Sequence, residues 1–318
     1  MIPTPRLRGA FTALVTPFTA DGALDEAAYR RLVIGQILSG IDGLVPVGTT
    51  GESPTLSQEE RDRCIGIAVT VAAERGGCVP VIAGTGSNDT RASIEATRRA
   101  AALGADAALI VTPYYNKPDQ RMLEAHFRAI ADEGGLPIVV YNVPGRTGAN
   151  VEADTFLRLA EHPRVIAVKE ASANIEQIAV ICRDRPRDVA VLSGDDAATL
   201  AVLAMGGDGV ISVASNQIPG EMSALCLAAH AGDFETARRI HDHWLPLLRA
   251  NFQGAPNPVP AKAAMLAMGL LERDDLRAPL LPLADAPRER LAGILRGLGL
   301  VADETGGMAG AEAEEAAA

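Results

Sequence analysis

The sequence predicts an α/β protein, a (β/α)8 TIM barrel that carries a C-terminal helical extension. Eight short apolar runs rich in β-branched residues recur along the chain, and each run ends in a polar or glycine-bearing turn. A segment long enough for a helix follows each run. Runs without a polar face are typical of parallel strands that helices cover, and eight alternating units indicate a barrel.

The eight strands are expected in order along the barrel segment. They lie near residues 11–15, 43–47, 79–83, 107–111, 137–141, 165–169, 189–193 and 209–213. Helix starts agree with this order, because Ser57 and Glu60 form a capping-box pattern and residues 88–90 offer a second cap. We therefore assign residues 8–215 to the barrel.

Residues 216–302 are expected to form the helical extension, packed on the barrel. Helical spacing of apolar residues occurs at 221–231, 233–250 and 260–270, and the proline-rich residues 256–260 open the last of these segments. Residues 303–318 contain five acidic residues, no basic residue and no large apolar group except Met308. This acidic tail is predicted to be disordered.

The composition excludes several classes of protein. The chain has 318 residues, of which 48% are hydrophobic and 22% charged, as in an ordinary globular protein. No stretch approaches the ~20 apolar residues of a membrane span, and the first residues lack the apolar segment of a signal peptide. The net charge of −11 and the lack of a basic stripe argue against a nucleic-acid partner. We expect a cytoplasmic protein with no membrane partner.

Neither a metal site nor a nucleotide cofactor is predicted. The four cysteines form no Cys-x-x-Cys pair and no Cys/His cluster of zinc-ligand spacing; they are Cys64, Cys78, Cys182 and Cys226. Residues 84–86 (GTG) lack the third glycine of a dinucleotide fingerprint, and the Walker A and His-Glu-x-x-His motifs are absent. We interpret the cysteines as small buried hydrophobic residues.

Lys169 is the leading candidate for a catalytic residue. In a barrel of this kind the active site lies at the carboxyl ends of the strands, and Lys169 closes the otherwise apolar sixth strand. A lysine becomes a good nucleophile when burial lowers its pKa from about 10.4 toward roughly 7–8. The alternative is a strand-end lysine paired with Glu170 or Asp195, and position alone does not separate the two. Lysine is scarce, since the 29 basic residues include only Lys117, Lys169 and Lys262, and arginine does not form an imine under ordinary conditions.

Reactive side chains also follow the second, fourth and fifth strands. Residues 48–51 (GTTG) form a turn whose N–H groups and Thr50 hydroxyl suit a carboxylate, although such turns are common without a ligand. Tyr115 and Tyr141 could deliver protons with Thr49 as a relay between them, or each could be a core residue.

Two further features have more than one interpretation. Arg146, on a Pro-Gly loop, could hold a second carboxylate through bidentate hydrogen bonds, or it could be a solvated loop residue. Asp195 and Asp196 could bind a divalent ion, but a cap for the next helix is the preferred interpretation.

Together these segments resemble the dihydrodipicolinate synthase family, also called the 4-hydroxy-tetrahydrodipicolinate synthase family, over roughly residues 8–300. Six motifs occur in the expected order, at 48–53 (GTTGES), 112–118 (TPYYNKP), 141–148 (YNVPGRTG), 168–170 (VKE), 192–196 (LSGDD) and 256–260 (PNPVP). Chance agreement of all six is not credible. The resemblance implies a cofactor-free lyase of the lysine (diaminopimelate) pathway.

The resemblance also implies a Schiff-base mechanism. Lys169 forms an imine with pyruvate, which tautomerises to an enamine and attacks the aldehyde carbon of L-aspartate 4-semialdehyde; cyclisation then frees the lysine. Tyr141 handles protons near the imine, and Thr49 bridges it to Tyr115. The implied substrate-binding residues are Thr50 for the pyruvate carboxylate, Arg146 for the carboxylate of the second substrate, and Gly194 and Ile211, whose backbone groups line the pocket.

Assembly and regulation are implied as well. Members of the family usually form homotetramers, as dimers of dimers in which a tyrosine reaches across the tight interface, and Tyr115 is the matching residue. In members inhibited by lysine, the inhibitor site uses a glutamate and often histidines, but Ala92, Gln58 and Arg61 stand at the matching positions. Loss of a carboxylate and gain of a cation weaken the binding of a dibasic ligand. We expect weak or absent inhibition by lysine.

Two alternatives stay open. Another pyruvate-dependent aldolase, acting on N-acetylneuraminate or a 2-keto-3-deoxy sugar acid, would use the same lysine. Residues 114–116 and 144–146 favour the synthase, because an aldehyde that bears a carboxylate calls for arginine whereas a polyol calls for neutral hydroxyl partners. A barrel that has lost catalysis would serve as a binding or regulatory protein, although every proposed chemical role is filled here.

Overall fold

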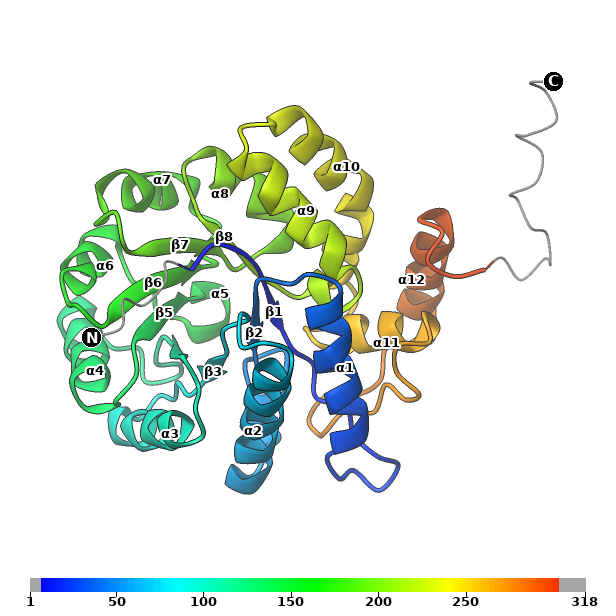
Figure 1. Ribbon diagram of the computed structural model, residues 1–318, viewed down its shortest axis with the longest axis horizontal. Coiled ribbons are helices and arrows are strands. Elements are labelled where there is room, and N and C mark those ends of the chain that lie inside the picture. Colours follow the sequence, from blue (N-terminus) through cyan, green and yellow to red (C-terminus); the bar gives the residue numbers. More distant parts are fainter. Residues whose placement is uncertain (1–6, 303–318) are drawn as a thin grey trace.

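Eight parallel strands form a ring at the centre of the structure, and helices surround it (Figure 1). The structure is a computed structural model that describes residues 7–302. The strands are β1 (Gly9–Ala13), β2 (Gly43–Val45), β3 (Ile82–Gly84), β4 (Ala107–Val111), β5 (Ile138–Asn142), β6 (Val165–Glu170), β7 (Ala190–Ser193) and β8 (Gly209–Ser212). They are hydrogen-bonded in the order β2-β1-β8-β7-β6-β5-β4-β3, and a parallel bridge between Leu44 and Val81 joins β2 to β3. The predicted TIM barrel is confirmed.

All eight expected strands are present, with their ends displaced by a few residues. The fourth strand matches its predicted range of 107–111, whereas the first begins earlier than residue 11. β1 begins at Gly9 because Gly9 pairs with Gly209 of β8 and its N–H donates to the Asp208 carbonyl at 2.8 Å. A Cβ atom at Gly209 would lie 1.9 Å from the Gly9 carbonyl oxygen, so this close pairing requires glycine.

Helices alternate with the strands around the ring. They are α1 (Glu26–Leu38), α2 (Gln58–Glu74), α3 (Thr90–Ala102), α4 (Gln120–Glu133), α5 (Pro144–Thr147), α6 (Ala153–Ala160), α7 (Ile175–Asp184), α8 (Thr199–Ala204) and α9 (Pro219–His230), with short 3-10 turns η1 (Ser53–Thr55), η2 (Asp196–Ala198) and η3 (Ala214–Asn216). Both helix starts predicted from the sequence are confirmed. Ser57 and Glu60 form a capping box at α2, and the side chain of Asp89 caps α3. Caps of this kind stabilise a helix by about 1 kcal/mol.

Three more helices complete the helical extension, namely α10 (Phe234–Ala250), α11 (Val259–Ala267) and α12 (Asp285–Gly297). Of the helices after β8, α9, α10 and α11 match the expected segments, and α12 has no predicted counterpart. Its apolar face is narrow, because only Leu291 and Leu295 are buried. In Figure 1, α11 and α12 lie outside the ring, on the side of α1. The predicted disordered tail at 303–318 lies outside the described residues.

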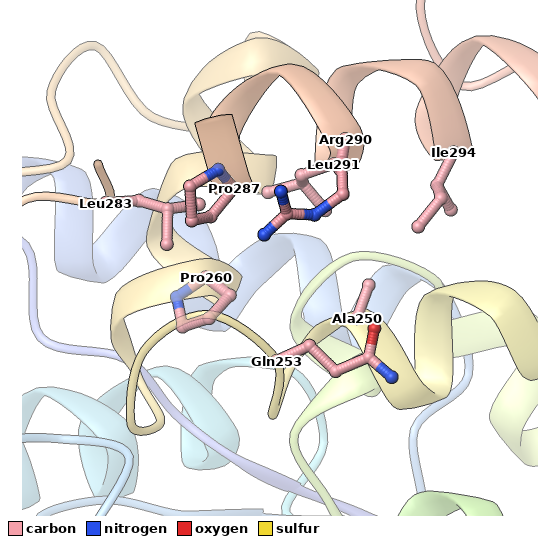
Figure 2. A pocket seen from close by; sticks show the side chains of 8 residues that line it. All are labelled: Ala250, Gln253, Pro260, Leu283, Pro287, Arg290, Leu291 and Ile294. Atoms are coloured by element: carbon pink, nitrogen blue, oxygen red, sulfur yellow. The ribbon is translucent and has the colours of Figure 1, made fainter. Parts of the chain in front are cut away.

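A small cavity marks the junction of α12 with the rest of the extension (Figure 2). Leu291 and Ile294 of α12 face Ala250 at the end of α10 and Pro260 of α11 across it. Its volume is about 20 Å³, which is room for one water molecule at most. This cavity is a packing gap rather than a ligand site.

The barrel interior forms an apolar core of its own. Phe11, Ile82, Leu109 and Tyr141 belong to it, and a second, larger core fills the space between strands and helices. Because successive strand residues point to opposite sides, Lys169 follows Ala167 into the barrel interior.

Within residues 7–302, no helix combines the length and the apolar character needed to cross a bilayer.

Candidate active site

Lys169 and Tyr141 lie side by side at the carboxyl ends of two neighbouring strands. The ladder between β5 and β6 pairs Tyr141 with Lys169 in register. The Lys169 Nζ atom lies 4.3 Å from the centre of the Tyr141 ring. Only 5% of Lys169 and 6% of Tyr141 are exposed. The structure thus places a lysine amine against a tyrosine in a nearly fully buried site.

Burial lowers the pKa of Lys169 to about 8, because the ammonium loses its hydration inside the barrel. Two charged groups modify this effect in opposite directions. The carboxyl of Asp196 raises the pKa of Lys169, and the guanidinium of Arg146 lowers it. A lysine with this pKa is a competent nucleophile near neutral pH.

Glu170, the residue after Lys169, is one of the two salt-bridge partners considered for this lysine, but its carboxylate binds other groups. Its carboxylate accepts hydrogen bonds from the Asn142 and Gln177 side chains, each at 3.1 Å, and from the Ser172 N–H at 2.7 Å. Among residues 7–302, no carboxylate lies within ion-pair distance of Lys169. The structure therefore disfavours the salt-bridge interpretation of this lysine.

Tyr141 and Thr49 form the next part of the site. Burial raises the pKa of the Tyr141 phenol, whereas Arg146 and a side-chain hydrogen bond with Thr49 lower it. The Tyr141 hydroxyl therefore stays protonated at neutral pH and can both donate and accept. The expected relay partner Thr49 is in contact with Tyr141.

The site opens into a cavity of about 260 Å³. Thr49 and Arg146 line it together with Tyr114 and Arg61. A smaller space of about 30 Å³, also lined by Thr49, reaches Tyr141. The lining of the large cavity contains two arginines, and neither lining contains an acidic residue, which favours an anionic ligand.

Gly84 and Gly86 form one wall of both spaces, a role that was not assigned to them from the sequence. A Cβ atom at Gly84 would lie 2.2 Å from the Val47 carbonyl oxygen, and one at Gly86 would lie 2.3 Å from the Val111 nitrogen. Backbone segments approach each other too closely for side chains here. Because neither glycine has a side chain, these backbone segments can pack closely and form a thin wall.

Thr50, Gly194 and Ile211 lie on three separate segments: the turn after β2, the end of β7 and β8 itself. Thr50 is buried, and its hydroxyl oxygen accepts a hydrogen bond of 3.0 Å from the Asn257 amide. A Cβ atom at Gly194 would lie 3.2 Å from the Lys169 Cε atom, so glycine leaves the space beside the amine open. Ile211 is buried in the barrel core that also contains Tyr141.

Arg146 and Tyr115 occupy more exposed positions than the residues around Lys169. Arg146 belongs to the short helix α5 and lines the large cavity. Tyr115 is 89% exposed and has a left-handed backbone with φ of 74°, which is rare for a non-glycine residue. Its neighbour Tyr114, not Tyr115, lines the cavity within this chain. The structure thus brings together the other proposed catalytic residues and leaves Tyr115 outside.

Asp195 and Asp196 have separate roles, although the sequence places them together. The Asp195 side chain accepts the Ala197 N–H at 3.0 Å and caps η2, which confirms the preferred interpretation. Asp196 is buried, and one of its oxygens accepts the N–H groups of Val213 and Ala214 at 3.0 and 2.9 Å. Burial raises the pKa of Asp196. Within the described part of the chain, no group of three or more His, Cys, Asp or Glu residues could hold a metal ion.

This arrangement can perform amine chemistry on a small anionic carbonyl compound. It supplies a buried nucleophilic amine at Lys169, a proton donor at Tyr141 and a hydroxyl at Thr49 next to the phenol. The arginine-lined cavity beside them suits a carboxylate. These are the components that a Schiff-base aldol reaction needs.

Comparisons with known proteins agree with this chemistry. Residues 6–298 match the Dihydrodipicolinate synthetase family. A 4-hydroxy-tetrahydrodipicolinate synthase from Koribacter versatilis (strain Ellin345) is 50% identical over 301 residues, which cover 94% of this chain and 99% of the relative.

Solved structures give the same result. A chloride-inhibited dihydrodipicolinate synthase from Acinetobacter baumannii, complexed with pyruvate, is 42% identical with a TM-score of 0.89, covering 93% of this chain and 100% of that one. A monomeric dihydrodipicolinate synthase variant, 41% identical, also has a TM-score of 0.89, covering 93% of this chain and 98% of that one. On the family match, the sequence identity and the shared fold, the chain belongs to the dihydrodipicolinate synthetase family.

Proposed function

We propose that this protein is a 4-hydroxy-tetrahydrodipicolinate synthase, a lyase that condenses pyruvate with L-aspartate 4-semialdehyde. The neutral amine of Lys169 adds to C2 of pyruvate, and loss of water gives an imine. Loss of a proton from C3 gives the enamine, whose C3 attacks the aldehyde carbon; the new alkoxide takes up a proton. The amino group of the second substrate then adds to C2 and displaces Lys169, which closes the ring. The net reaction releases one water molecule and regenerates the amine.

The burial of the Lys169 amine against Tyr141 is the observation that carries this proposal. With a pKa of about 8, about one amine in ten is unprotonated at pH 7, compared with fewer than about one in a thousand at the ordinary lysine pKa. The position of Tyr141, 4.3 Å from Nζ, supports a role in proton transfer at the carbinolamine and imine. Thr49, hydrogen-bonded to Tyr141, would pass the proton onward.

Two carboxylate sites complete the proposal. We assign the pyruvate carboxylate to the Thr50 hydroxyl and the N–H groups of residues 48–51. We assign the carboxylate of the semialdehyde to Arg146, which lines the large cavity and is exposed. Gly194 and Ile211 would line the pocket through backbone groups. No step of this reaction calls for a metal or cofactor.

The proposed assembly is a homotetramer, a dimer of dimers. The exposure of Tyr115 supports this assembly, because a tyrosine that lies outside its own site is available to a second copy of the chain. A monomeric variant exists among the relatives, so family membership alone does not fix the oligomeric state. We propose a cytoplasmic location, and the four free cysteines fit a reducing compartment.

Borohydride trapping tests the function. Incubation with pyruvate and borohydride should convert the imine to a stable adduct, and peptide mass mapping should place it on Lys169. Because the chain has only three lysines, the assignment is unambiguous. The variant K169R should give no adduct, and K117R, which changes an exposed lysine, should give the wild-type yield.

Two outcomes would change the conclusion. Wild-type protein that gives no adduct at Lys169 would contradict the mechanism. An adduct without turnover of L-aspartate 4-semialdehyde, in a parallel assay, would instead favour an aldolase for N-acetylneuraminate or a 2-keto-3-deoxy sugar acid. Turnover of the semialdehyde supports the synthase.

A further inference from the structure

The loop that carries Thr49 and Thr50 has an unusual backbone at both of its ends. Val47 and Glu52 have φ values of 59° and 55°, in the left-handed region that non-glycine residues rarely adopt. A β-branched residue such as Val47 is especially strained there. Strained conformations persist only where surrounding contacts over-determine them. The loop at residues 47–52 therefore depends on neighbours that hold it in place.

The helical extension supplies one such contact directly to Thr50. The Nδ2 atom of Asn257 donates to Thr50 Oγ1 at 3.0 Å, and both residues are buried. An amide nitrogen can only donate, so the Thr50 oxygen is the acceptor in this pair and its hydrogen is free for another partner. A carboxylate oxygen can only accept. Asn257 therefore orients the Thr50 hydroxyl in the sense that a bound carboxylate requires.

A second contact from the extension holds the end of the loop. The ammonium of Lys262, in α11, donates to the Glu52 carboxylate at 2.8 Å, to the Thr16 carbonyl at 2.8 Å and to the Asp275 carbonyl at 2.5 Å. All three donors of the lysine are used, and its side chain has no exposed surface. An arginine fork does not match three acceptors around one point. This fit explains the presence of a lysine in a chain that otherwise uses arginine.

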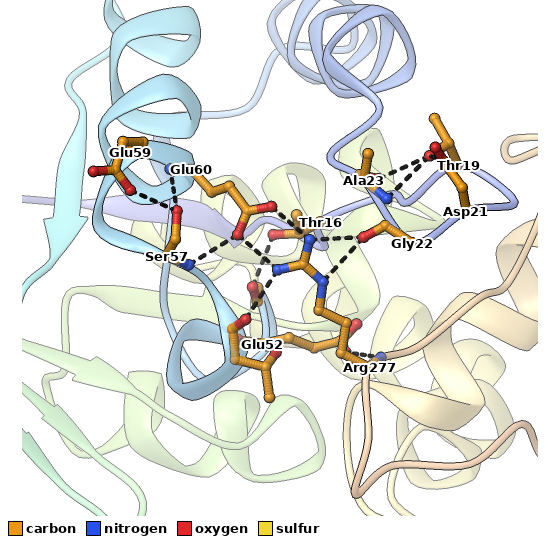
Figure 3. Close-up of polar contacts among 12 residues, drawn as sticks. Thr16, Thr19, Asp21, Gly22, Ala23, Glu52, Ser57, Glu59, Glu60 and Arg277 are labelled. Carbon is orange, nitrogen blue, oxygen red and sulfur yellow. Dashed lines mark hydrogen bonds and ion pairs between the residues drawn. The ribbon is translucent and has the colours of Figure 1, made fainter.

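The other oxygen of Glu52 is held by a neighbouring segment of the extension. It accepts the backbone N–H of Arg277 at 3.0 Å. The Arg277 guanidinium extends to Glu60 at the start of α2, with a distance of 2.6 Å from Nη1 to Oε2 (Figure 3). Both cations also contact Phe18. The centre of the Phe18 ring lies 4.5 Å from the Lys262 Nζ atom and 4.4 Å from the Arg277 Cζ atom. Both carboxylate oxygens of Glu52 are thus fixed by residues 262–277.

We propose that Asn257 and Lys262 are positioning residues, through which the helical extension holds the Thr49–Thr50 loop in the form that binds the pyruvate carboxylate. Neither residue touches the reacting atoms. Asn257 sets the direction of the Thr50 hydroxyl, and Lys262 keeps Glu52 in its left-handed conformation. This inference rests on the proposed function, because it takes the carboxylate at Thr50 to be that of pyruvate.

The variant N257A tests the first contact. Borohydride trapping at graded pyruvate concentrations should show a half-saturating concentration about five- to tenfold above wild type, because the Thr50 hydroxyl loses its orienting hydrogen bond. The maximal yield at saturating pyruvate should change much less. N257D should be worse than N257A, because a carboxylate accepts the Thr50 hydrogen and also repels the ligand.

Asn251 offers a matched structural control. It is a buried asparagine of the same extension, and its side chain exchanges two hydrogen bonds of 2.9 Å with Gln217. N251A removes a comparable buried hydrogen-bond pair away from the loop. It should lower the melting temperature at least as much as N257A does, with no change in the half-saturating pyruvate concentration.

The second contact needs a variant that leaves no unpaired buried charge. K262M alone leaves the buried Glu52 carboxylate without its cation and should lower the melting temperature strongly. The double variant E52Q/K262M removes both charges and should recover much of that loss. It should still require more pyruvate for half-saturation, by about fivefold, because the αL conformation of residue 52 loses its ionic restraint.

The outcomes separate this inference from the proposed function. If wild type gives the Lys169 adduct while N257A and E52Q/K262M saturate at the same pyruvate concentration as N251A, the positioning role is wrong and the function stands. If wild type gives no adduct, the function fails and this inference fails with it. A higher half-saturating pyruvate concentration in both N257A and E52Q/K262M, with no change in N251A, supports the inference.

Discussion

The Lys169 amine faces the ring of Tyr141 at 4.3 Å, and both residues occupy paired positions at the ends of β6 and β5. This pairing is a consequence of parallel register, because neighbouring strands present in-register residues to the same side of the sheet. The barrel therefore holds the proposed nucleophile and the proposed proton donor on strands rather than on loops. Precision of this kind suits a reaction in which one amine must pass through several intermediates.

The rate of imine formation should rise with pH and reach half of its maximum near pH 8. Protonated Lys169 is unreactive, and its pKa is about 8, so the rate of adduct formation should increase as the pH rises through this value. The measurement is the initial rate of borohydride-trapped adduct at saturating pyruvate between pH 6 and about 10. A rate that is flat across this range would contradict a pKa near 8.

Two substitutions should move the pH of half-maximal rate in opposite directions. Asp196 raises the pKa of Lys169, so D196N should shift the profile to lower pH. Arg146 lowers the pKa of Lys169, so R146M should shift the profile to higher pH. Since Arg146 is exposed, its effect should shrink at high salt, whereas the effect of buried Asp196 should not. Shifts of the same sign in both variants would show that another group controls the titration.

Gly194 should tolerate no side chain. In G194A the new Cβ atom would lie 2.7 Å from the Ala171 Cβ atom and 3.2 Å from the Lys169 Cε atom, so either the backbone or the lysine must move. Overpacking of this size costs about 1–3 kcal/mol, and at the amine it should slow adduct formation by about tenfold or more. G145A is the matched control at the same end of the barrel, because a Cβ atom there meets open space. Equal adduct rates in the two variants would contradict this role of Gly194.

Much of the fold and part of the site could be predicted from the sequence. The strands were predictable because each is an apolar run bounded by turns, and α12 was not, because it buries only two leucines. Lys169, Tyr141 and Thr49 were predictable because the barrel brings the ends of all strands to one face. The boundary between barrel and extension at residue 215 stays a prediction.

The contacts that orient these residues could not be predicted in the same way. Asp196 holds backbone groups 17 and 18 residues away, and the Asn257–Thr50 and Lys262–Glu52 contacts join residues 207 and 210 positions apart. No local pattern specifies such pairs. The scarcity of lysine was the one available signal, since it applies to Lys262 as much as to Lys169.

Inhibition by lysine should be weak or absent. Arg61, which the resemblance to the family matches to its inhibitor site, lines the large cavity and donates from Nη2 to the Ser53 carbonyl at 2.8 Å. Its positive charge opposes a dibasic ligand, and Ala92 offers no carboxylate to an α-amino group. Turnover should be unchanged when L-lysine is added to low millimolar concentration. Strong inhibition in that range would contradict the prediction, and the double variant R61H/A92E should increase sensitivity.

Mixed assemblies should show whether Tyr115 acts in a neighbouring subunit. Y115F should keep its stability, because the Tyr115 side chain is 89% exposed, but should lose most of its turnover if the phenol completes a partner's relay. K169A should also be inactive, because it lacks the proposed nucleophile. In a Y115F/K169A dimer, one of the two sites receives Lys169 from the first subunit and Tyr115 from the second, so it is complete.

Equal mixing with free exchange should therefore restore about a quarter of the wild-type turnover, since half of the dimers are mixed and each has one complete site. The measurement is turnover of pyruvate and L-aspartate 4-semialdehyde after unfolding and refolding the two variants together. Each variant refolded alone is the control. If the mixture is no more active than the sum of the separate variants, Tyr115 does not act across an interface.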